Sequence, residues 1–99
     1  MSCRVELLPR ALEDAFHART WYDEQREGLG AEFEESLEAA LSTIRRFPDL
    51  YPRVRGNMRR CLLGKFPYGI FYEIVGEDVA LVAAVFHTSR GPEALADHF

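Results

Sequence analysis

The segment from Arg59 to Val75 constrains the fold of this chain more than any other stretch. Apolar, β-branched and aromatic residues alternate with polar ones on both sides of a Gly/Pro interruption, which is typical of two strands that meet at a turn. We predict strands at about Met58–Lys65 and Tyr68–Val75, and a third strand at Val79–His87 after the tight connection Gly76-Glu77-Asp78. Together these strands would form an antiparallel meander.

Two helices are predicted before the strands. Apolar side chains recur every three or four residues from Arg10 to about Arg26 and from about Ala31 to Phe47, so each helix has one face suited to burial. Gly28 and Gly30 place a turn between the helices, and Pro48 ends the second one. The residues expected on the buried faces are Leu12, Ala15, Phe16, Ala18 and Tyr22 in the first helix and Phe33, Leu37, Ala40, Leu41, Ile44 and Phe47 in the second.

A short first strand and a tail complete the predicted order. Residues 3–8 alternate as a strand that Pro9 stops, residues 49–57 indicate a loop, and residues 93–99 indicate a tail with a short helical turn. The order is one strand, two helices and three strands, which predicts an α+β protein with a helical hairpin against a mainly antiparallel sheet. At 99 residues, we expect a single domain over the whole chain.

The net formal charge of −4 conceals an uneven distribution of charge along the chain. Residues 1–44 carry −6, residues 45–66 carry +6 and residues 67–99 carry −4. The basic middle segment could meet nucleic acid or an acidic protein surface, although the acidic total is unlike that of a general nucleic-acid binder. We therefore expect a polarised surface.

The cysteines and the apolar runs argue against a metal site and a membrane segment. Cys3 and Cys61 have no metal-type spacing with the three histidines, so we expect two free thiols packed in strands, with neither a metal nor a cofactor. No apolar run reaches the roughly 18 residues of a membrane span, and the N-terminus lacks the apolar region of a signal peptide. These features favour a cytoplasmic protein.

An ordered series of motifs extends along nearly the whole chain. It consists of Ala18-Arg19-Thr20-Trp21-Tyr22, Pro48-Asp49-Leu50-Tyr51-Pro52, Arg59-Arg60, Phe66-Pro67-Tyr68-Gly69-Ile70-Phe71-Tyr72 and Val85-Phe86-His87-Thr88-Ser89-Arg90-Gly91-Pro92. In this order, and in so short a chain, the series resembles the RelE/ParE superfamily of bacterial type II toxins. The resemblance implies a small toxin that a cognate antitoxin holds inactive by wrapping it with its C-terminal segment. Some branches of the superfamily cut mRNA on the ribosome, whereas the ParE-like branch poisons DNA gyrase by binding it.

Individual positions favour one of these two activities. Members that cut mRNA place an arginine where this chain has Gly69, and one branch follows the histidine of the last strand with a tyrosine where this chain has Thr88. Some add a tyrosine in the tail, where this chain has Ala94 and Leu95. The resemblance therefore favours a ParE-like toxin that acts by binding gyrase.

Two alternatives remain, and whether the chain is an enzyme stays open with them. A ribosome-dependent mRNA endoribonuclease would use His87 as a base near neutral pH, together with Arg90, in a rearranged site. An inactive relative would only bind a partner. A structural His87 would cap the end of its strand by hydrogen-bonding a carbonyl or carboxylate of the tail.

The candidates for contact with a partner are four basic residues, Arg59, Arg60, Lys65 and Arg90. Alternation places Arg59 and Lys65 on one face of the predicted strand and Arg60 on the other. These side chains could pair with an acidic antitoxin segment or a phosphate backbone, or they could be solvated. The chain could also form a homodimer through its helices or a hetero-oligomer with the antitoxin.

Four aromatic residues have a structural and a functional interpretation. We expect Trp21, Tyr22, Tyr68 and Tyr72 to pack in the core rather than to form a stacking platform for bases. The acidic face of the second helix would repel RNA, which counts against a nuclease.

Overall fold

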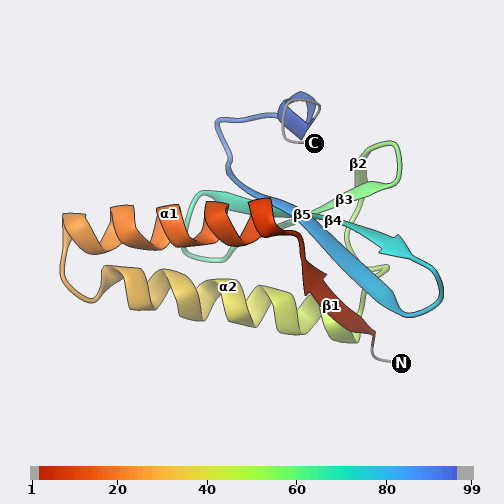
Figure 1. The fold of residues 1–99 in the computed structure, drawn as a ribbon, viewed down its shortest axis with the longest axis horizontal. Coiled ribbons are helices and arrows are strands. Elements are labelled where there is room, and N and C mark those ends of the chain that lie inside the picture. The colour runs from red at the N-terminus through yellow and green to blue at the C-terminus, as the bar shows by residue number, and fades with distance from the viewer. Residues whose placement is uncertain (1–2, 96–99) are drawn as a thin grey trace.

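The computed structural model describes residues 3–95 and has the predicted α+β arrangement (Figure 1). A short strand leads into a helical hairpin, and a strand meander follows. The elements are β1 (Arg4–Leu7), α1 (Pro9–Gln25), α2 (Leu29–Arg46), β2 (Arg53–Arg55), β3 (Met58–Leu62), β4 (Tyr68–Val75), β5 (Val79–His87) and the 3-10 helix η1 (Pro92–Ala94).

The five strands form one mixed sheet in the order β1-β5-β4-β3-β2. β1 pairs with β5 in parallel, with Val5 opposite Ala80, and every other pair is antiparallel. The helical hairpin connects β1 to the rest of the sheet and lies across one face (Figure 1). β5 is therefore an interior strand, as its almost unbroken apolar sequence indicates.

The corner between the helices depends on two glycines with different roles. Gly28 has a φ of +90°, a conformation in which a side chain would be strained. Gly30 lies inside α2, and a Cβ atom there would sit 2.6 Å from the carbonyl oxygen of Arg19 on α1. Asp23 accepts hydrogen bonds from the amides of both glycines, which holds the start of α2 in place. The predicted turn is thus shorter than expected, because Gly30 serves close helix packing.

The main core fills the space between the hairpin and the sheet. Phe33 stacks on Tyr22 of α1 and contacts Phe66 and Tyr68 edge-on, with ring centroids 5.2 to 5.4 Å apart. The other fully buried side chains of this core are Ala11, Ile44, Cys61, Ile70, Tyr72, Ala80 and Val82.

Part of the predicted buried surface is exposed instead. The exposed fractions of Leu12, Phe16 and Trp21 are 56%, 64% and 54%, so the prediction was wrong for these three side chains. The small residues Ala11 and Ala18 face the sheet because they let α1 approach β5 closely. Phe47, predicted on the buried face of α2, is also exposed, because it follows the last residue of the helix.

A β-bulge at Ala83 changes which side chains of β5 face the helices. Phe71 pairs with Ala84 and Tyr72 with Val82, which leaves Ala83 without an opposite residue. Before the bulge Val82 faces the helices, whereas after it Ala84 faces the opposite side of the sheet. This switch lets one continuous apolar strand contribute to two cores.

The second core lies on the face of the sheet opposite the helices, where the C-terminal segment covers it. It joins Phe71, Ala84 and Phe86 to Leu95, with Val54, Met58 and Ala94 at its border. Of the helical turn predicted in residues 93–99, residues 96–99 lie outside the described residues, and η1 already begins at Pro92.

The meander has one strand more than predicted. Residues 53–55 form β2 within the predicted loop, because Arg53 pairs with Arg59 and Arg55 with Met58. β3 ends at Leu62 rather than at Lys65, so Lys65 belongs to the connection between β3 and β4. The alternation that placed Arg59 and Lys65 on one strand face therefore does not extend to Lys65.

Candidate functional site

His87 lies at the end of β5, beside Tyr68 at the start of β4. The two rings are 5.3 Å apart and nearly perpendicular. The amide N–H of Ser89 donates to Nδ1 of His87 at 3.0 Å, and Oγ of Ser89 lies 2.9 Å from the same nitrogen. Nδ1 therefore acts as an acceptor within the turn after β5, rather than as a donor to a carbonyl or carboxylate of the tail, and Nε2 is left as the nitrogen available to a ligand.

A surface pocket of about 340 Å³ opens between α1 and this end of the sheet. Asp14 anchors one wall, because its Oδ2 accepts a hydrogen bond from the amide of Val85 at 3.0 Å. The exposed Trp21 stands at the rim against the ring of Tyr22. The polar and aromatic side chains that line the pocket are Asp14, His17, Trp21, Tyr68, His87 and Arg90.

Arg60 and Arg90 flank one strand pair on the sheet face opposite the helices. Gly69 pairs with Phe86, and the guanidinium carbon of Arg90 lies 3.9 Å from the centroid of the Phe86 ring. The aliphatic stem of Arg60 lies over Gly69, where a Cβ atom would meet Cγ of Arg60 at 3.2 Å. The structure thus brings together two of the four predicted partner-binding residues.

Arg59 is separate from this pair and is engaged inside the molecule. Only 14% of its side chain is exposed. Its Nη1 donates to the carbonyl oxygens of Tyr51 at 2.6 Å and Asp49 at 3.3 Å, and its Nη2 lies 3.6 Å from the Asp49 carboxylate. Arg59 holds the loop that follows α2, and its guanidinium is engaged with that loop.

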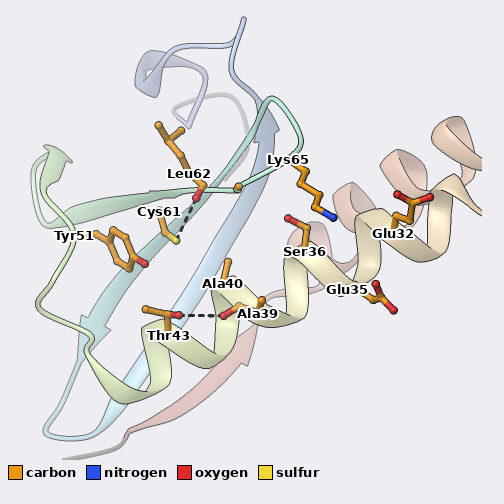
Figure 2. Close-up of a pocket in the computed structure, with 11 residues that line it drawn as sticks. Glu32, Glu35, Ser36, Ala39, Ala40, Thr43, Tyr51, Cys61, Leu62 and Lys65 are labelled. Carbon is orange, nitrogen blue, oxygen red and sulfur yellow. Dashed lines mark hydrogen bonds between the residues drawn. The ribbon is translucent and has the colours of Figure 1, made fainter.

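Lys65 borders a second pocket, of about 410 Å³, between α2 and β3 (Figure 2). The α2 wall combines small side chains at helical spacing with two carboxylates, namely Ser36, Ala39, Ala40 and Thr43 with Glu32 and Glu35. Tyr51 and Cys61 close the inner end, and the carbonyl oxygen of Leu62 faces Sγ of Cys61 at 3.8 Å (Figure 2). The sequence analysis missed this pocket, although a stripe of small residues on α2 was the signal for it.

The titratable groups at the inner end of this pocket are held in their neutral forms. Burial raises the pKa of the Tyr51 hydroxyl to about 12, and the neighbouring Cys61 thiol contributes to that shift. Burial also raises the pKa of the Cys61 thiol, which therefore stays protonated near neutral pH. Cys3 and Cys61 are both free thiols, as predicted.

A third hollow, an apolar groove of about 310 Å³, lies between α1 and α2. Leu12, Ala15 and Phe16 contribute from α1, and Leu37 and Leu41 contribute from α2. Arg19 and Glu34 form an ion pair at its edge, with Nε and Oε2 2.5 Å apart. This groove accounts for the exposed Leu12 and Phe16.

Over residues 3–95, no cluster of His, Cys, Asp and Glu side chains has the grouping that could hold a metal ion. In the same range, neither helix combines the length and apolarity needed to cross a membrane.

Comparison with known proteins places this arrangement in a family. A sequence profile described as "ParE toxin of type II toxin-antitoxin system, parDE" matches residues 5–92. The chain belongs to the ParE toxin family. Among solved structures it is similar to one described as "Chromosomal ParDE TA system from P. aeruginosa", with a TM-score of 0.66 and 9% identity over 87% of this chain and 96% of that chain. At that identity the likeness shows a shared fold. A search of curated protein sequences gives no match.

In this ParE-family chain, the two predicted catalytic residues share a pocket. His87 and Arg90 both line the pocket beside α1. Cleavage at a 2′-hydroxyl needs a base, cationic donors for the phosphate and an acid for the leaving oxygen. Arg59 makes intramolecular bonds, and the stem of Arg60 crosses Gly69. Of the predicted residues, His87 and Arg90 line this pocket, together with Asp14, His17 and Tyr68.

Proposed function

We propose that this ParE-family chain stops bacterial growth by binding DNA gyrase, and that a cognate antitoxin neutralises it. The observation that carries this choice is Gly69, which stands where mRNA-cutting relatives place an arginine and lies beneath the stem of Arg60. Gly69 supplies no cation beside His87, and the guanidinium of the neighbouring Arg90 is stacked over the ring of Phe86. The mode of action would then be docking on a protein, without bond cleavage.

Binding to an antitoxin is supported by the apolar surface that the helices leave uncovered. Leu12 and Phe16 border the groove between α1 and α2, and each is more than half exposed. Exposed apolar surface of this kind marks interaction sites. Because gyrase and the antitoxin would meet the chain in the cytoplasm, the proposal places its action there.

A second candidate function is the ribosome-dependent cleavage of mRNA. It is favoured by one observation, the pocket that His87 shares with Arg90, His17 and Tyr68. In that reading Nε2 of His87 would take the proton of the 2′-hydroxyl, because Nδ1 already accepts from Ser89.

Expression of the chain without an antitoxin separates these functions. The readouts are gyrase-linked double-strand breaks in DNA and cleavage of mRNA mapped at codon resolution in the same cells. We expect DNA breaks with intact mRNA, and growth arrest that survives His87→Ala. Codon-phased cuts that disappear in His87→Ala would establish the nuclease instead, and the absence of both effects would indicate an inactive relative.

A further inference from the structure

A hollow of about 660 Å³ lies at the end of the molecule where α2 finishes, β1 begins and β4 turns into β5. The amide of Cys3 donates to the carbonyl oxygen of Arg45 at 2.9 Å, and the amide of Arg4 donates to that of Asp78 at 2.7 Å. These two bonds join the start of β1 to the end of α2 and to the β4–β5 turn (Figure 1). This α2-end hollow is thus built from three segments that lie far apart in the sequence.

Two large apolar side chains of the α2-end hollow are exposed. The exposed fractions of Phe47 and Leu50 are 52% and 63%, and the partly buried Ile74 lines the hollow with them. Apolar surface of this kind gains free energy when a partner removes it from water. The hollow therefore has the character of an interaction surface.

The loop that carries the two exposed apolar side chains, residues 47–51, is fixed from beneath. The hydroxyl of Tyr72 donates to the carbonyl oxygen of Pro48 at 2.6 Å, and Nη1 of Arg59 donates to that of Asp49 at 3.3 Å. The backbone of the loop is therefore ordered before any partner arrives. Preorganisation of this kind favours affinity, because little conformational freedom is left to lose on binding.

The charges around the α2-end hollow are mainly negative. Among the described residues, three carboxylates line it, those of Asp49, Glu77 and Asp78, against the one guanidinium of Arg46. That guanidinium is stacked over the adjacent phenyl ring, with its carbon 5.3 Å from the centroid. Nη2 of Arg59 approaches the Asp49 carboxylate at 3.6 Å, yet 83% of the Asp49 side chain is exposed. Carboxylates repel the phosphates of nucleic acid and attract lysine and arginine.

We propose that the α2-end hollow is the surface with which this chain docks on gyrase, and that it receives a basic protein segment with an apolar side chain seated between Phe47 and Leu50. This inference rests on the proposed function. Over residues 3–95 the hollow shares no lining residue with the groove between α1 and α2. Leu41, the last groove residue of α2, precedes Phe47 by six residues, which is roughly 9 Å along the helix. The groove therefore stays available to the antitoxin.

A matched pair of leucine variants tests the proposal by binding to purified gyrase. Leu50→Ala removes an apolar anchor from the hollow, and Leu62→Ala removes a leucine of similar exposure, 55%, from β3. We expect Leu50→Ala to bind gyrase about tenfold more weakly, as for an interface anchor, and Leu62→Ala to bind like the wild type. Thermal unfolding confirms that both variants are folded. Equal binding of the two variants and the wild type would overturn the assignment.

A matched pair of charge reversals tests the chemistry of the occupant. Glu77→Lys changes a carboxylate of the hollow, and Glu27→Lys makes the same change in the turn between the helices. We expect Glu77→Lys to weaken gyrase binding at least about fivefold at low ionic strength and less at high ionic strength, because salt screens the attraction. Glu27→Lys should leave binding unchanged. Tighter binding by Glu77→Lys would indicate an acidic or nucleic-acid occupant and would overturn the proposal.

Two further readouts on Leu50→Ala distinguish gyrase from other occupants. The variant should bind the antitoxin, the protein whose co-expression restores growth, as tightly as the wild type does. Loss of antitoxin binding with intact gyrase binding would assign the hollow to the antitoxin instead. A wild-type dimer in sedimentation that Leu50→Ala dissociates would assign it to a second copy. If the wild-type chain does not bind gyrase, the proposed function fails, whereas a wild type and Leu50→Ala that bind gyrase equally refute this inference alone.

Discussion

Two glycines show how differently the same residue type is used in this chain. A Cβ atom at Gly30 would lie 2.6 Å from a backbone oxygen of the neighbouring helix, which cannot move without separating α1 from α2. At Gly69 the nearest atoms belong to the flexible stem of Arg60, at 3.2 Å. Gly30 is required for the close packing of the two helices. The space beside Gly69 is occupied by the flexible stem of Arg60.

A matched pair of alanine substitutions follows from this contrast. Gly30→Ala should lower the free energy of unfolding by about 2 kcal/mol or more, because overpacking against the backbone forces the helices apart. Gly69→Ala should change it by less than about 1 kcal/mol, since Arg60 can swing away. Urea denaturation of both variants measures the difference, and equal losses would contradict the distinction.

The two adjacent arginines of β3 also have different roles. Arg59 donates to two loop carbonyls and is largely buried, whereas Arg60 makes no ion pair within residues 3–95. Arg59→Ala should cost about 1.5 to 3 kcal/mol of stability, the range for hydrogen bonds from a charged group. Arg60→Ala should cost less than about 0.5 kcal/mol and act through the antitoxin affinity. Thermal unfolding and a binding titration of both variants separate stability from recognition, and similar unfolding temperatures would refute the assigned roles.

Buried tyrosines make the stability of the chain sensitive to alkaline pH. Burial raises the pKa of Tyr72 to about 12, and its hydroxyl donates to the carbonyl oxygen of Pro48 at 2.6 Å. The unfolded chain releases this proton near pH 10, so the stability present below pH 10 should fall between pH 10 and 12. Denaturation across this pH range should show a smaller loss of stability with pH for Tyr72→Phe than for the wild type. Tyr51, Tyr22 and Tyr68, whose pKa values burial also raises, should account for the loss that remains. An unchanged slope would contradict the account of Tyr72.

At the scale of elements, Asp14 joins the helical hairpin to the sheet. Its carboxylate accepts a hydrogen bond from the amide of Val85, which lies beyond the point where the pairing of β1 with β5 ends. Asp14→Ala should destabilise the fold by about 1 to 3 kcal/mol, because it leaves a buried donor unsatisfied. Asp14→Asn keeps an acceptor oxygen and should lose less than half of that. Denaturation curves of the two variants provide the comparison, and equal losses would show that the hydrogen bond to Val85 is not the cause.

Patterns within single elements were sufficient to predict most of the fold. Features that depend on contacts between elements could not be predicted from these patterns. The periodicity of Phe33, Leu37 and Ile44 identified the buried face of α2, and the almost unbroken apolar sequence of β5 is typical of the interior strand that it forms. The exposure of Leu12 and Phe16 could not be predicted, because it depends on how closely Ala11 and Ala18 let α1 approach the sheet.

The candidate site shows the same limit. The bulge at Ala83 and the pairing of residues 53–55 depend on contacts between strands that no local pattern encodes. Sequence reasoning proposed Arg60 and Arg90 separately, and only the register of Gly69 with Phe86 reveals that they flank one strand pair. It also proposed Arg59, whose burial under the loop after α2 could not be seen from its position in a strand.

At the scale of the whole molecule, different segments of the chain pack on the two faces of the sheet. The helices cover one face of the sheet (Figure 1), and Leu95 of the C-terminal segment packs against Phe71 and Phe86 on the other. A partner that fills the groove between α1 and α2 would contact Leu12 and Phe16, which are exposed in the free chain. Such a partner would stabilise the chain as well as block its surfaces.

The central claim is that this ParE-family chain acts by binding gyrase rather than by cutting RNA. The most direct measurement adds the purified chain to purified DNA gyrase, ATP and supercoiled plasmid and quantifies linear, gyrase-linked DNA. The account predicts that cleaved complexes increase with the concentration of the chain and that His87→Ala has the same effect. Gyrase that is unaffected by the chain, together with mRNA that is cut when the chain is added to translating ribosomes, would contradict it.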